Sequence, residues 1–537
     1  MTEEPEAANK SNKGKTNIIG DAHTFIDSTD AIIIGAGMGG LSAAAYLAQA
    51  GRRVIVLEQD HHLGGTAHIF RRGGFTFPTG PQSVTMPSYI SDSLSELGVE
   101  QPPGFIRDCF QVRRGAMDVV ISVPFDRLLK QLLDNFPKER KGILSVINIL
   151  EEVMAALDGL GISDLIEPKV NCSSSRLVLE RWGSVSAKEL LDSHLKDERL
   201  KDLLGSQGTS ETEMPVVLLA EMWRFMAKVG IWYVKGGIDA VPLLFASRVR
   251  AFGGEIRLGE RVKRILVQDG ATAGVELAGG AWIKSPLVIS DADYRKTILE
   301  LLPPGTITAH QKEEVSRMRL TSSAFTVFLG VKRENVYLSA FCGNHLLVKL
   351  REGRAVPWEQ KRPCPEDFLR DDIWLSWWSR HDTTLAPQGF EALMIKVDAP
   401  FDYFARFSGG GRGCHHEHYY SMKEEMADAL VAAAAEVVPG LPGAVVVREV
   451  ATPLTYRYWG HRSEGSVAGW SWRSVDQPRP WARSLAITPV KGLLIVGLQS
   501  FSHLFYGGMG TSIYSGRYAA DLVLSGRSWK RRGGLRV

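Results

Sequence analysis

The chain of 537 residues is long enough for two or more domains, and 44% hydrophobic with 23% charged residues is the balance of an ordinary globular protein. Its net charge of +3 is too small to indicate nucleic-acid binding, so we expect no nucleic-acid partner. The five cysteines are scattered without a C-x-x-C pair, which argues against a zinc site, an iron–sulfur site and a disulfide framework. We therefore expect no metal and a reducing, cytoplasmic location.

The first 28 residues are polar and of mixed charge, without the basic start and apolar core of a signal peptide. We predict a mobile N-terminal tail over 1–28. Residues 31–51 are apolar enough to resemble a membrane helix, but their glycines and their pattern favour a buried strand–turn–helix unit. We expect no transmembrane span.

The stretch AIIIGAGMGGLSAAAYLAQAGRRVIVLEQ occupies residues 31–59. Its pattern predicts a strand over 31–34, a glycine turn, a helix over 39–50 and a second strand over 53–57. Such apolar strands are typical of the centre of a parallel sheet that is buried on both faces. A helix that begins directly after a glycine turn points its N-terminal amides at a bound phosphate.

The glycines of this turn form a G-x-G-x-x-G motif at Gly35, Gly37 and Gly40, and Glu58 ends the second strand. The first glycine allows the tight turn, the second lets the backbone approach a pyrophosphate, and the third lets the helix pack closely on the sheet. The acid can accept hydrogen bonds from ribose hydroxyls. Because strand, helix and acid all accompany the glycines, we predict a dinucleotide site rather than a turn without a ligand.

Three further stretches bear on which dinucleotide is bound. The glycine pair Gly64-Gly65 follows closely and lets a second backbone turn approach the pyrophosphate. Residues 253–280 alternate like a β-hairpin and carry a V-x-x-I element that starts at Val262. Residues 492–524 form a second strand–glycine–helix unit at the far end of the chain.

Taken in this order, these segments resemble the FAD-dependent family of phytoene desaturases, carotenoid isomerases and retinol saturases, within the flavin amine oxidase superfamily. The resemblance covers nearly all of 29–525. It includes WYVKGGIDAVPLLFASRVRAFGGEI at 232–256 and SPLVISDAD at 285–293. It also includes FPKERKGI at 136–143, which is close to a pattern of the isomerase and saturase branches.

The resemblance implies FAD as the cofactor and an α/β fold. In this fold a Rossmann-type FAD-binding domain of the glutathione-reductase-like class is interleaved with an α+β substrate domain that has an antiparallel sheet and a helical cap. The implied FAD-binding domain is discontinuous and covers 29–110, 225–314 and 486–525, and the substrate domain covers 111–224 and 315–485.

The same resemblance implies the residues that hold FAD, because they match the family's motifs. They are Gly35, Gly37, Met38, Gly39, Gly40, Glu58, Gly64, Gly65, Thr66, Val262, Gly497, Gly508, Met509 and Gly510. Two positions depart from the family. Pro78 stands where the family usually carries Asp, and Leu498 stands where many members carry the Asp that binds the ribityl chain, so flavin affinity or orientation is in question.

Two apolar stretches are candidates for the substrate domain. Residues 214–234 predict an apolar helix whose charges at Glu221, Arg224 and Lys228 form one narrow stripe, so that it is either a core helix or the wall of a lipid tunnel. In DDIWLSWWSRHD, three tryptophans gather at 374, 377 and 378. They provide either flat walls for a conjugated chain or ordinary strand packing.

Three further features of the sequence bear on the electron partner, on membrane contact and on metal binding. No second nucleotide fingerprint occurs, so we expect electrons to be exchanged with a quinone, oxygen or a redox protein. The tail at 526–537 holds five basic residues, no acid and Trp529, which favours peripheral contact with a membrane over a merely solvated tail. The consecutive residues of CHHEH at 414–418 do not converge on one ion, so we predict a polar helix entry there.

These observations predict an FAD-dependent oxidoreductase that desaturates, saturates or isomerises a long apolar polyene or isoprenoid substrate, with hydride transfer at flavin N5. The residue pairs His503 and Tyr506, and Trp232 and Tyr233, are candidates for the active face. One alternative is an amine oxidase or porphyrinogen oxidase with a compact polar pocket. The other is a non-enzymatic escort protein for prenylated proteins, which has a similar fold and binds no flavin.

Overall fold

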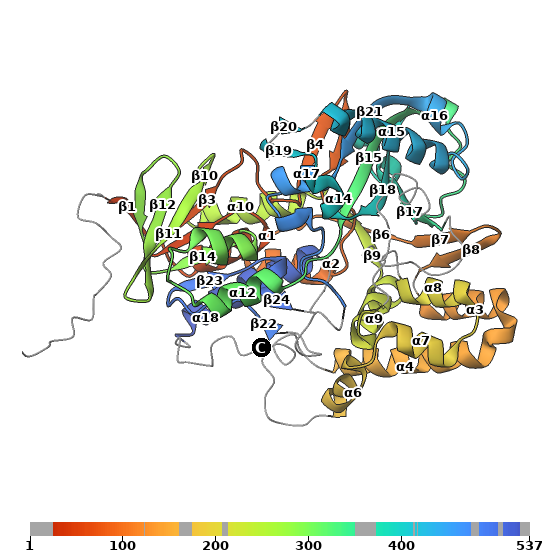
Figure 1. Cartoon of the computed structure of the whole chain (residues 1–537), viewed down its shortest axis with the longest axis horizontal. Helices are drawn as coiled ribbons and strands as arrows, with labels where there is room; N and C mark the ends of the chain where they lie inside the picture. The colour runs from red at the N-terminus through yellow and green to blue at the C-terminus, as the bar shows by residue number, and fades with distance from the viewer. Residues whose placement is uncertain are drawn as a thin grey trace, which may run out of the picture.

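The computed structural model places the elements in two groups that lie side by side (Figure 1). One group surrounds a parallel sheet and is called here the parallel-sheet half. The other consists of a large mixed sheet and a layer of helices. The structure describes residues 25–122, 124–159, 174–206, 213–349, 372–411, 414–415, 417–473, 483–502 and 508–526.

The parallel-sheet half is built on five strands that are all paired in parallel. Their order is β10 (Glu255–Leu258), β3 (Val54–Glu58), β2 (Ala31–Ile34), β14 (Val288–Ser290) and β23 (Leu493–Ile495). One face packs on α1 (Met38–Gln49), α10 (Ala240–Ala251) and α18 (Gly508–Leu524). All four residues of β2 are buried because alternate side chains enter two different cores, which explains its unbroken apolar run.

A four-stranded sheet lies against the other face of the parallel sheet. Its strand order is β1 (Phe25–Ser28), β13 (Trp282–Lys284), β12 (Ala271–Leu277) and β11 (Val262–Gln268). The hairpin expected within 253–280 is formed by β11 and β12. The predicted tail over 1–28 needs correction, since its last four residues form β1 and pair in parallel with β13; residues 1–24 lie outside the described residues.

The second group contains a seven-stranded sheet. Its strands are antiparallel except for one parallel pair, β16 with β7, so the expected antiparallel sheet is in fact mixed. The helix α15 (Glu417–Ala434) packs on one face. The strand order is β21 (Val445–Ala451), β15 (Ser323–Lys332), β18 (Phe390–Ala399), β17 (Ile373–Trp377), β16 (His345–Val348), β7 (Phe110–Arg114) and β8 (Met117–Ile121).

The helical layer packs beside β7 and β8 and shares one apolar core with them (Figure 1). Its described helices are α3 (Phe125–Asn135), α4 (Arg140–Asp158), α6 (Ser174–Gly183), α7 (Ala187–His194), α8 (Glu198–Ser206) and α9 (Val216–Trp223). The chain thus enters and leaves the parallel sheet several times, which is the interleaving that the motifs implied. The limits of the two domains stay a prediction.

The single helix predicted over 214–234 is not continuous. After α9 the chain follows a π-helix over Arg224–Val229, turns at Gly230 with φ of 91°, and continues as β9 (Ile231–Val234), which pairs with β6 (Phe105–Asp108). The glycine ends the helix because its φ lies in the left-handed region. The buried Glu221 accepts hydrogen bonds from the Arg224 guanidinium at 2.8 and 3.0 Å, so the charge stripe is partly an internal ion pair.

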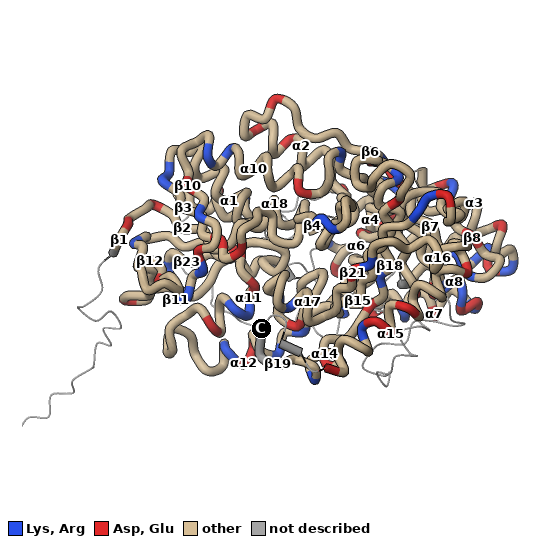
Figure 2. The backbone as a smooth tube through the Cα atoms, turned by 90° about the horizontal axis from the view of Figure 1, so that it is seen from above, with Lys and Arg blue, Asp and Glu red and all other residues tan. Residues whose placement is uncertain are grey.

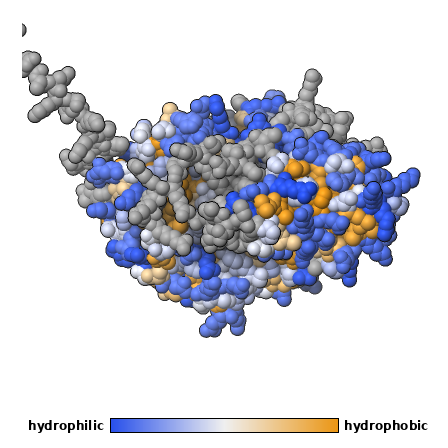
Figure 3. Space-filling model, turned by 90° about the horizontal axis from the view of Figure 1, so that it is seen from below, coloured by the Kyte–Doolittle hydropathy of each residue, from blue (hydrophilic) through white to orange (hydrophobic). Residues whose placement is uncertain are grey.

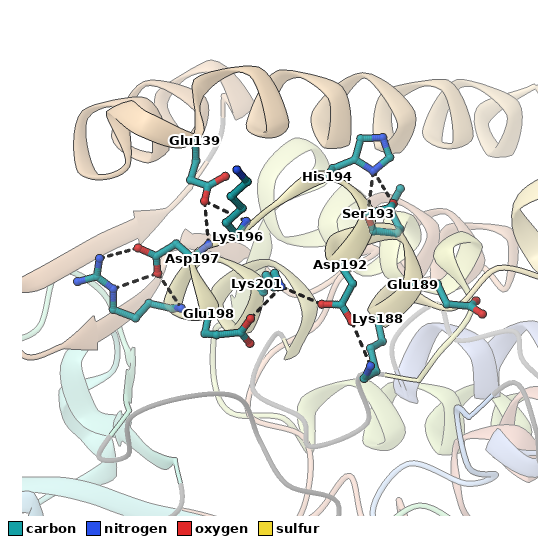
Figure 4. Close-up of polar contacts among 12 residues, drawn as sticks. Glu139, Lys188, Glu189, Asp192, Ser193, His194, Lys196, Asp197, Glu198 and Lys201 are labelled. Carbon is teal, nitrogen blue, oxygen red and sulfur yellow. Dashed lines mark hydrogen bonds and ion pairs between the residues drawn. The ribbon is translucent and has the colours of Figure 1, made fainter.

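The FPKERKGI segment connects the helices of this layer (Figure 4). The Glu139 carboxylate accepts hydrogen bonds from the backbone amides of Lys196 and Asp197 at 2.9 and 2.8 Å. A Cβ at Gly142 would collide with the carbonyl oxygen of His194, so only glycine allows this approach. These contacts hold α4 against the turn between α7 and α8, which gives the motif a structural role in the helical layer.

Basic and acidic residues are interspersed along the backbone of both groups (Figure 2). Figure 4 shows one such set, in which Lys201 contacts Asp192 at 2.9 Å and Glu198 at 2.8 Å. Among the described residues, no helix is both long and apolar enough to cross a membrane.

Candidate active site

One cavity of about 1290 Å³ begins at the carboxyl edge of the parallel sheet and continues to the face of the seven-stranded sheet. Parallel strands end at the same edge, so this edge collects loops that are far apart in the sequence. Most of the predicted cofactor residues therefore meet there. Those that line the cavity are Gly35, Gly37, Met38, Glu58, Gly64, Gly65, Thr66, Val262, Gly497, Gly508 and Met509.

Gly39, Gly40 and Gly510 are the other predicted cofactor residues, and they do not belong to the lining that the described residues form. A Cβ at Gly40 would collide with the Gly35 carbonyl oxygen, and one at Gly39 would collide with the Gly497 backbone. A Cβ at Gly510 would lie 3.3 Å from the Met86 sulfur. Gly39 and Gly40 therefore bring backbone segments together behind the cavity, and Gly510 lies against the Met86 side chain.

Glu58 lies at the end of β3 and is only 8% exposed. Its carboxylate accepts hydrogen bonds from the backbone amides of Ala36 at 2.7 Å and Asp60 at 2.9 Å. These contacts hold the carboxylate at the cavity wall next to the first glycine turn. A ribose hydroxyl could share this acceptor, as the motif predicts.

Two loops that sequence analysis did not connect close one side of the cavity. His461 lies 2.7 Å from the Asp60 carboxylate, and the Arg462 guanidinium donates to the Thr66 hydroxyl at 3.0 Å. His62 stacks on His68 with ring centroids 4.0 Å apart. Burial, with a smaller contribution from His62, lowers the pKa of His68 to about 4, so this ring is neutral near pH 7. Isolated histidines and arginines in the sequence carry no signal for such contacts.

Asp291 is a site residue that sequence analysis missed, although it lies in the quoted SPLVISDAD segment. It directly follows β14 and lines the cavity. The Gly40 amide donates to its carboxylate at 2.8 Å. Burial, with a smaller contribution from the negative charge of Glu58, raises the pKa of this carboxyl to about 7. The sequence does contain a signal for this residue, namely an acidic residue at the carboxyl end of a parallel strand.

The two departures from the family pattern both line the cavity. Pro78 ends β5 (Phe75–Pro78), and Leu498 begins the short 3-10 turn after Gly497. Leu498 offers no carboxylate for a ribityl chain. The Asp291 carboxylate, however, is so close to Gly497 that a Cβ there would collide with it, so an acid is present beside this turn on the neighbouring strand.

The far part of the cavity is mainly apolar. Residues from the discontinuous helix of 214–234 form one wall, which supports a tunnel-wall role for that segment. Of the three clustered tryptophans only Trp374 faces the cavity; the Trp377 indole donates to Glu391, and Trp378 is buried. The apolar lining comprises Phe110, Met222, Phe225, Met226, Ile231, Phe328, Trp374, Met394 and Trp472.

Two of the four catalytic candidates from the sequence need correction. Trp232 and Tyr233 lie on β9 and are not among the described residues that line the cavity. Tyr233 is buried against Trp378, and its hydroxyl donates to Asp382 at 3.1 Å, so its role is in packing. The sequence indicated aromatic side chains but not the direction in which the strand presents them. His503 and Tyr506 lie outside the described residues.

The CHHEH segment begins with the short strand β20 (Cys414–His415), and α15 starts at Glu417; residue 416 lies outside the described residues. Within the described ranges, no group of three His, Cys, Asp or Glu residues could hold a metal ion.

These residues fit the diphosphate half of FAD. Side chains at Gly37, Gly39 and Gly497 would fill the narrow space between the turns at 35–40 and at 497, and α1 starts there and presents its N-terminal amides. Glu58, Val262 and Gly508 all line the same cavity. When bound, FAD supplies two-electron hydride chemistry, and the protein supplies its position and surroundings.

Comparison with known proteins agrees with this geometry. Residues 38–524 match the family of flavin containing amine oxidoreductases. The chain is 25% identical over 531 residues to prolycopene isomerase of Daucus carota, which covers 93% of this chain and 81% of that protein. It is 28% identical over 390 residues to the zeta-carotene-forming phytoene desaturase of Myxococcus xanthus, with 69% and 72% covered. It is 24% identical over 529 residues to all-trans-retinol 13,14-reductase of Danio rerio, with 88% and 82% covered.

The fold is shared with putrescine oxidase. The wild-type enzyme bound to putrescine superimposes with a TM-score of 0.60 at 15% identity, covering 93% of this chain and 99% of that one. This likeness concerns the fold alone, whereas the family match spans most of the chain and confirms the resemblance predicted from the motifs. The protein belongs to the family of flavin containing amine oxidoreductases and is an FAD-dependent oxidoreductase.

Proposed function

We propose that the protein acts on a long, apolar polyene or isoprenoid chain by passing hydride between a carbon of that chain and N5 of the flavin. The observation that carries this proposal is the continuity of the cavity, which joins the glycine turns at one end to an apolar chamber at the other. Desaturation, saturation and cis–trans isomerisation all need this arrangement.

The chamber suits a flat conjugated chain. Trp374, Phe110 and Phe225 provide aromatic surfaces, and three methionines provide adaptable ones. The Phe110 and Trp374 rings lie 4.8 Å apart, so together they form one continuous wall. The named relatives support the same substrate class, since they are a prolycopene isomerase, a phytoene desaturase and a retinol reductase.

A few polar groups interrupt this apolar wall. The hydroxyls of Thr326 and Tyr456 lie 2.7 Å apart, and burial raises the pKa of Tyr456 to about 12, so its hydroxyl stays protonated near neutral pH. The Lys396 ammonium lies 5.2 Å from the centroid of the Trp374 ring. These groups are placed to contact a polar end of the chain or to hold the proton that accompanies a hydride in desaturation or saturation.

The FPKERKGI segment does not favour one of the three reactions. It resembles the isomerase and saturase branches, but Glu139 and Gly142 contact the turn between α7 and α8 and lie away from the cavity lining. The motif therefore supports a shared architecture of the helical layer.

We also propose that the protein binds a membrane surface peripherally from the cytoplasmic side, where an insoluble substrate would be available. The basic tail after residue 526 supports this, although 527–537 lie outside the described residues. Apolar side chains also gather on the lower face, toward the end that carries the helical layer (Figure 3). Leu177 on α6 of this layer is 58% exposed. A quinone, oxygen or a redox protein would be the electron partner.

The test is expression in a host that accumulates cis and trans carotenoid precursors, followed by comparison of lipid masses and retention times with an empty-vector control. Loss of two hydrogens identifies a desaturase, a gain identifies a saturase, and an unchanged mass with shifted retention identifies an isomerase. No change from a protein that carries FAD would reject the carotenoid assignment and favour other isoprenoids or the amine and tetrapyrrole alternatives. A protein without flavin would favour an escort function.

Two tryptophans on the same strand provide a matched pair for this assay. Trp374→Ala removes part of the cavity wall, whereas Trp377→Ala changes the opposite face of β17. We expect Trp374→Ala to raise the KM for the chain by about tenfold or more, because losing half of the roughly 3 kcal/mol that a buried indole contributes corresponds to about a factor of ten. Trp377→Ala should leave the KM unchanged, and equal effects of both would argue against the chamber.

A further inference from the structure

Asp291 occupies an unusual position in the parallel-sheet half. It follows β14, which lies between β2 and β23, and these two neighbouring strands lead into the glycine turns at 35–40 and at 497. The side chain therefore enters the space between the turn at 35–40 and the turn at 497. It is half-buried, and its exposed part faces the cavity.

The glycines make room for this carboxylate. A Cβ at Gly37 would collide with Oδ2 and one at Gly497 with Oδ1, and a Cβ at Gly39 would lie 2.7 Å from Oδ1. The Gly40 amide, the third in α1, donates to Oδ2 at 2.8 Å. Since Gly37 at the N-cap of α1 has no side chain, Asp291 serves as the cap from another strand.

The same helix N-terminus is where an FAD pyrophosphate binds in this fold. An ionised Asp291 would then stand beside two phosphate charges in a passage that the cofactor closes to water. Like charges in such surroundings repel strongly. Glu58 from β3 adds another negative charge nearby, while Arg462 from the loop after α17 (Pro453–Tyr458) adds a positive one.

We propose that Asp291 takes up one proton from solvent when FAD binds, so that this residue couples cofactor affinity to pH. The reaction converts the carboxylate into a carboxylic acid, and no electrons are transferred. The acid form removes the repulsion and gains a donor that can point at a phosphate oxygen. The proposal does not depend on the substrate, since FAD is already assigned.

The pKa of this carboxyl agrees with such a coupling, because burial and Glu58 already raise it to about 7 in the absence of cofactor. Phosphate charges would raise it further, so that the group gains a proton on binding throughout the range above pH 7.

Isothermal titration of FAD into flavin-free, full-length protein tests the proposal without measuring activity. Titrations at pH 6, 7, 8 and 9 in two buffers of different ionisation enthalpy give the number of protons taken up per FAD. We expect about one proton at pH 8 and 9 and clearly less at pH 6, with the Kd rising about tenfold per pH unit above pH 7.

Asp291→Asn keeps the shape and an acceptor for the Gly40 amide but cannot take up the proton. We expect this variant to bind FAD with no proton uptake, a Kd that is flat between pH 7 and 9, and tighter binding than the wild type at pH 9. Asp269→Asn, in the turn between β11 and β12, is the matched control and should behave as the wild type.

Absence of proton uptake by the wild type at pH 8, with FAD binding intact, would overturn the proposal, as would uptake that persists in Asp291→Asn. If Asp291→Asn does not fold, the number of protons that the wild type takes up still decides the proposal. A purely structural cap at Asp291 would weaken FAD binding equally at every pH when replaced, which distinguishes the two roles. Failure of the wild type to bind FAD at all would contradict the cofactor assignment itself.

Discussion

The parallel-sheet half and the helical layer each carry a motif that is visible in the sequence, and the two motifs do different work. In the parallel-sheet half, Gly35, Gly37 and Glu58 face a cavity that a dinucleotide fits. In the helical layer, Glu139 and Gly142 contact the chain's own turn at 194–197. A motif shared with relatives can therefore belong to a ligand-binding site or to a packing contact within the protein. The contacts that its residues make in the structure show which of the two it is. Substitutions at the glycine turn of the parallel-sheet half should therefore reduce FAD binding. Substitutions at the motif of the helical layer should reduce stability and leave FAD binding unchanged.

The largest expected effect is at the first glycine turn. Gly40→Val should abolish FAD binding and most soluble protein, because its Cβ would collide with the Gly35 carbonyl and misplace the turn. We expect a loss of more than about 3 kcal/mol of folding free energy. Flavin absorbance relative to protein after purification measures the outcome. Gly279→Ala, where a Cβ would have no neighbour within 4 Å, is the control, and normal flavin content in Gly40→Val would contradict the assignment of the turn.

A smaller effect concerns pH and the flavin-free protein. The carboxyl pKa of Asp291 is raised from 3.8 to about 7, so the folded state binds this proton more tightly than the unfolded state does. Stability from this group is therefore present at low pH and is lost as pH rises from about 4 to about 7. After a discount for solvent screening in the cavity, the loss amounts to about 2 kcal/mol.

Denaturant unfolding at pH 5 and pH 8 measures this loss. Because pH 5 to pH 8 covers about two thirds of the interval between the unfolded and the folded pKa, Asp291→Asn should lose about 1 kcal/mol less than the wild type between the two pH values. Identical pH slopes for the two proteins would show that Asp291 does not titrate in this range.

The third prediction concerns the helical layer and tests whether its motif affects stability without affecting FAD binding. Gly142→Ala should destabilise the protein by about 1–3 kcal/mol, because the added methyl group collides with the His194 carbonyl oxygen. FAD affinity should stay within about twofold of the wild-type value, since neither Gly142 nor His194 lines the cavity. Thermal unfolding and flavin titration measure the two quantities. Gly443→Ala is the control, and loss of flavin by Gly142→Ala would break the separation of the two regions.

The smallest effect is expected at Glu139. Glu139→Ala removes the acceptor for the amides of Lys196 and Asp197 and should cost about 1 kcal/mol, as for the loss of a helix cap. Glu139→Gln keeps an acceptor oxygen and should cost less. Chemical denaturation of both variants checks the order, and an equal loss in both would mean that the charge, and not the hydrogen bonds, matters at this position.

The sequence alone determined the elements whose signals are local. The strand at 31–34, the helix that begins at Met38 in place of residue 39, and the hairpin formed by β11 and β12 were all indicated by periodicity and glycine placement. The order of the motifs along the chain also predicted FAD as the cofactor. These features were predictable because neighbouring residues in the chain specify them, through strand alternation, helix spacing and turn geometry.

Only the tertiary structure decided which side chains meet. The Gly40 amide and the Asp291 carboxylate are 251 positions apart, and no local pattern indicates that they share a hydrogen bond. The same holds for Tyr233, which turns away from the cavity to contact Trp378 and Asp382. The pairing of β1 with β13 is likewise non-local. Such contacts arise from the order and direction of strands in the sheets, because strands from distant segments end at one edge and only there bring their side chains together.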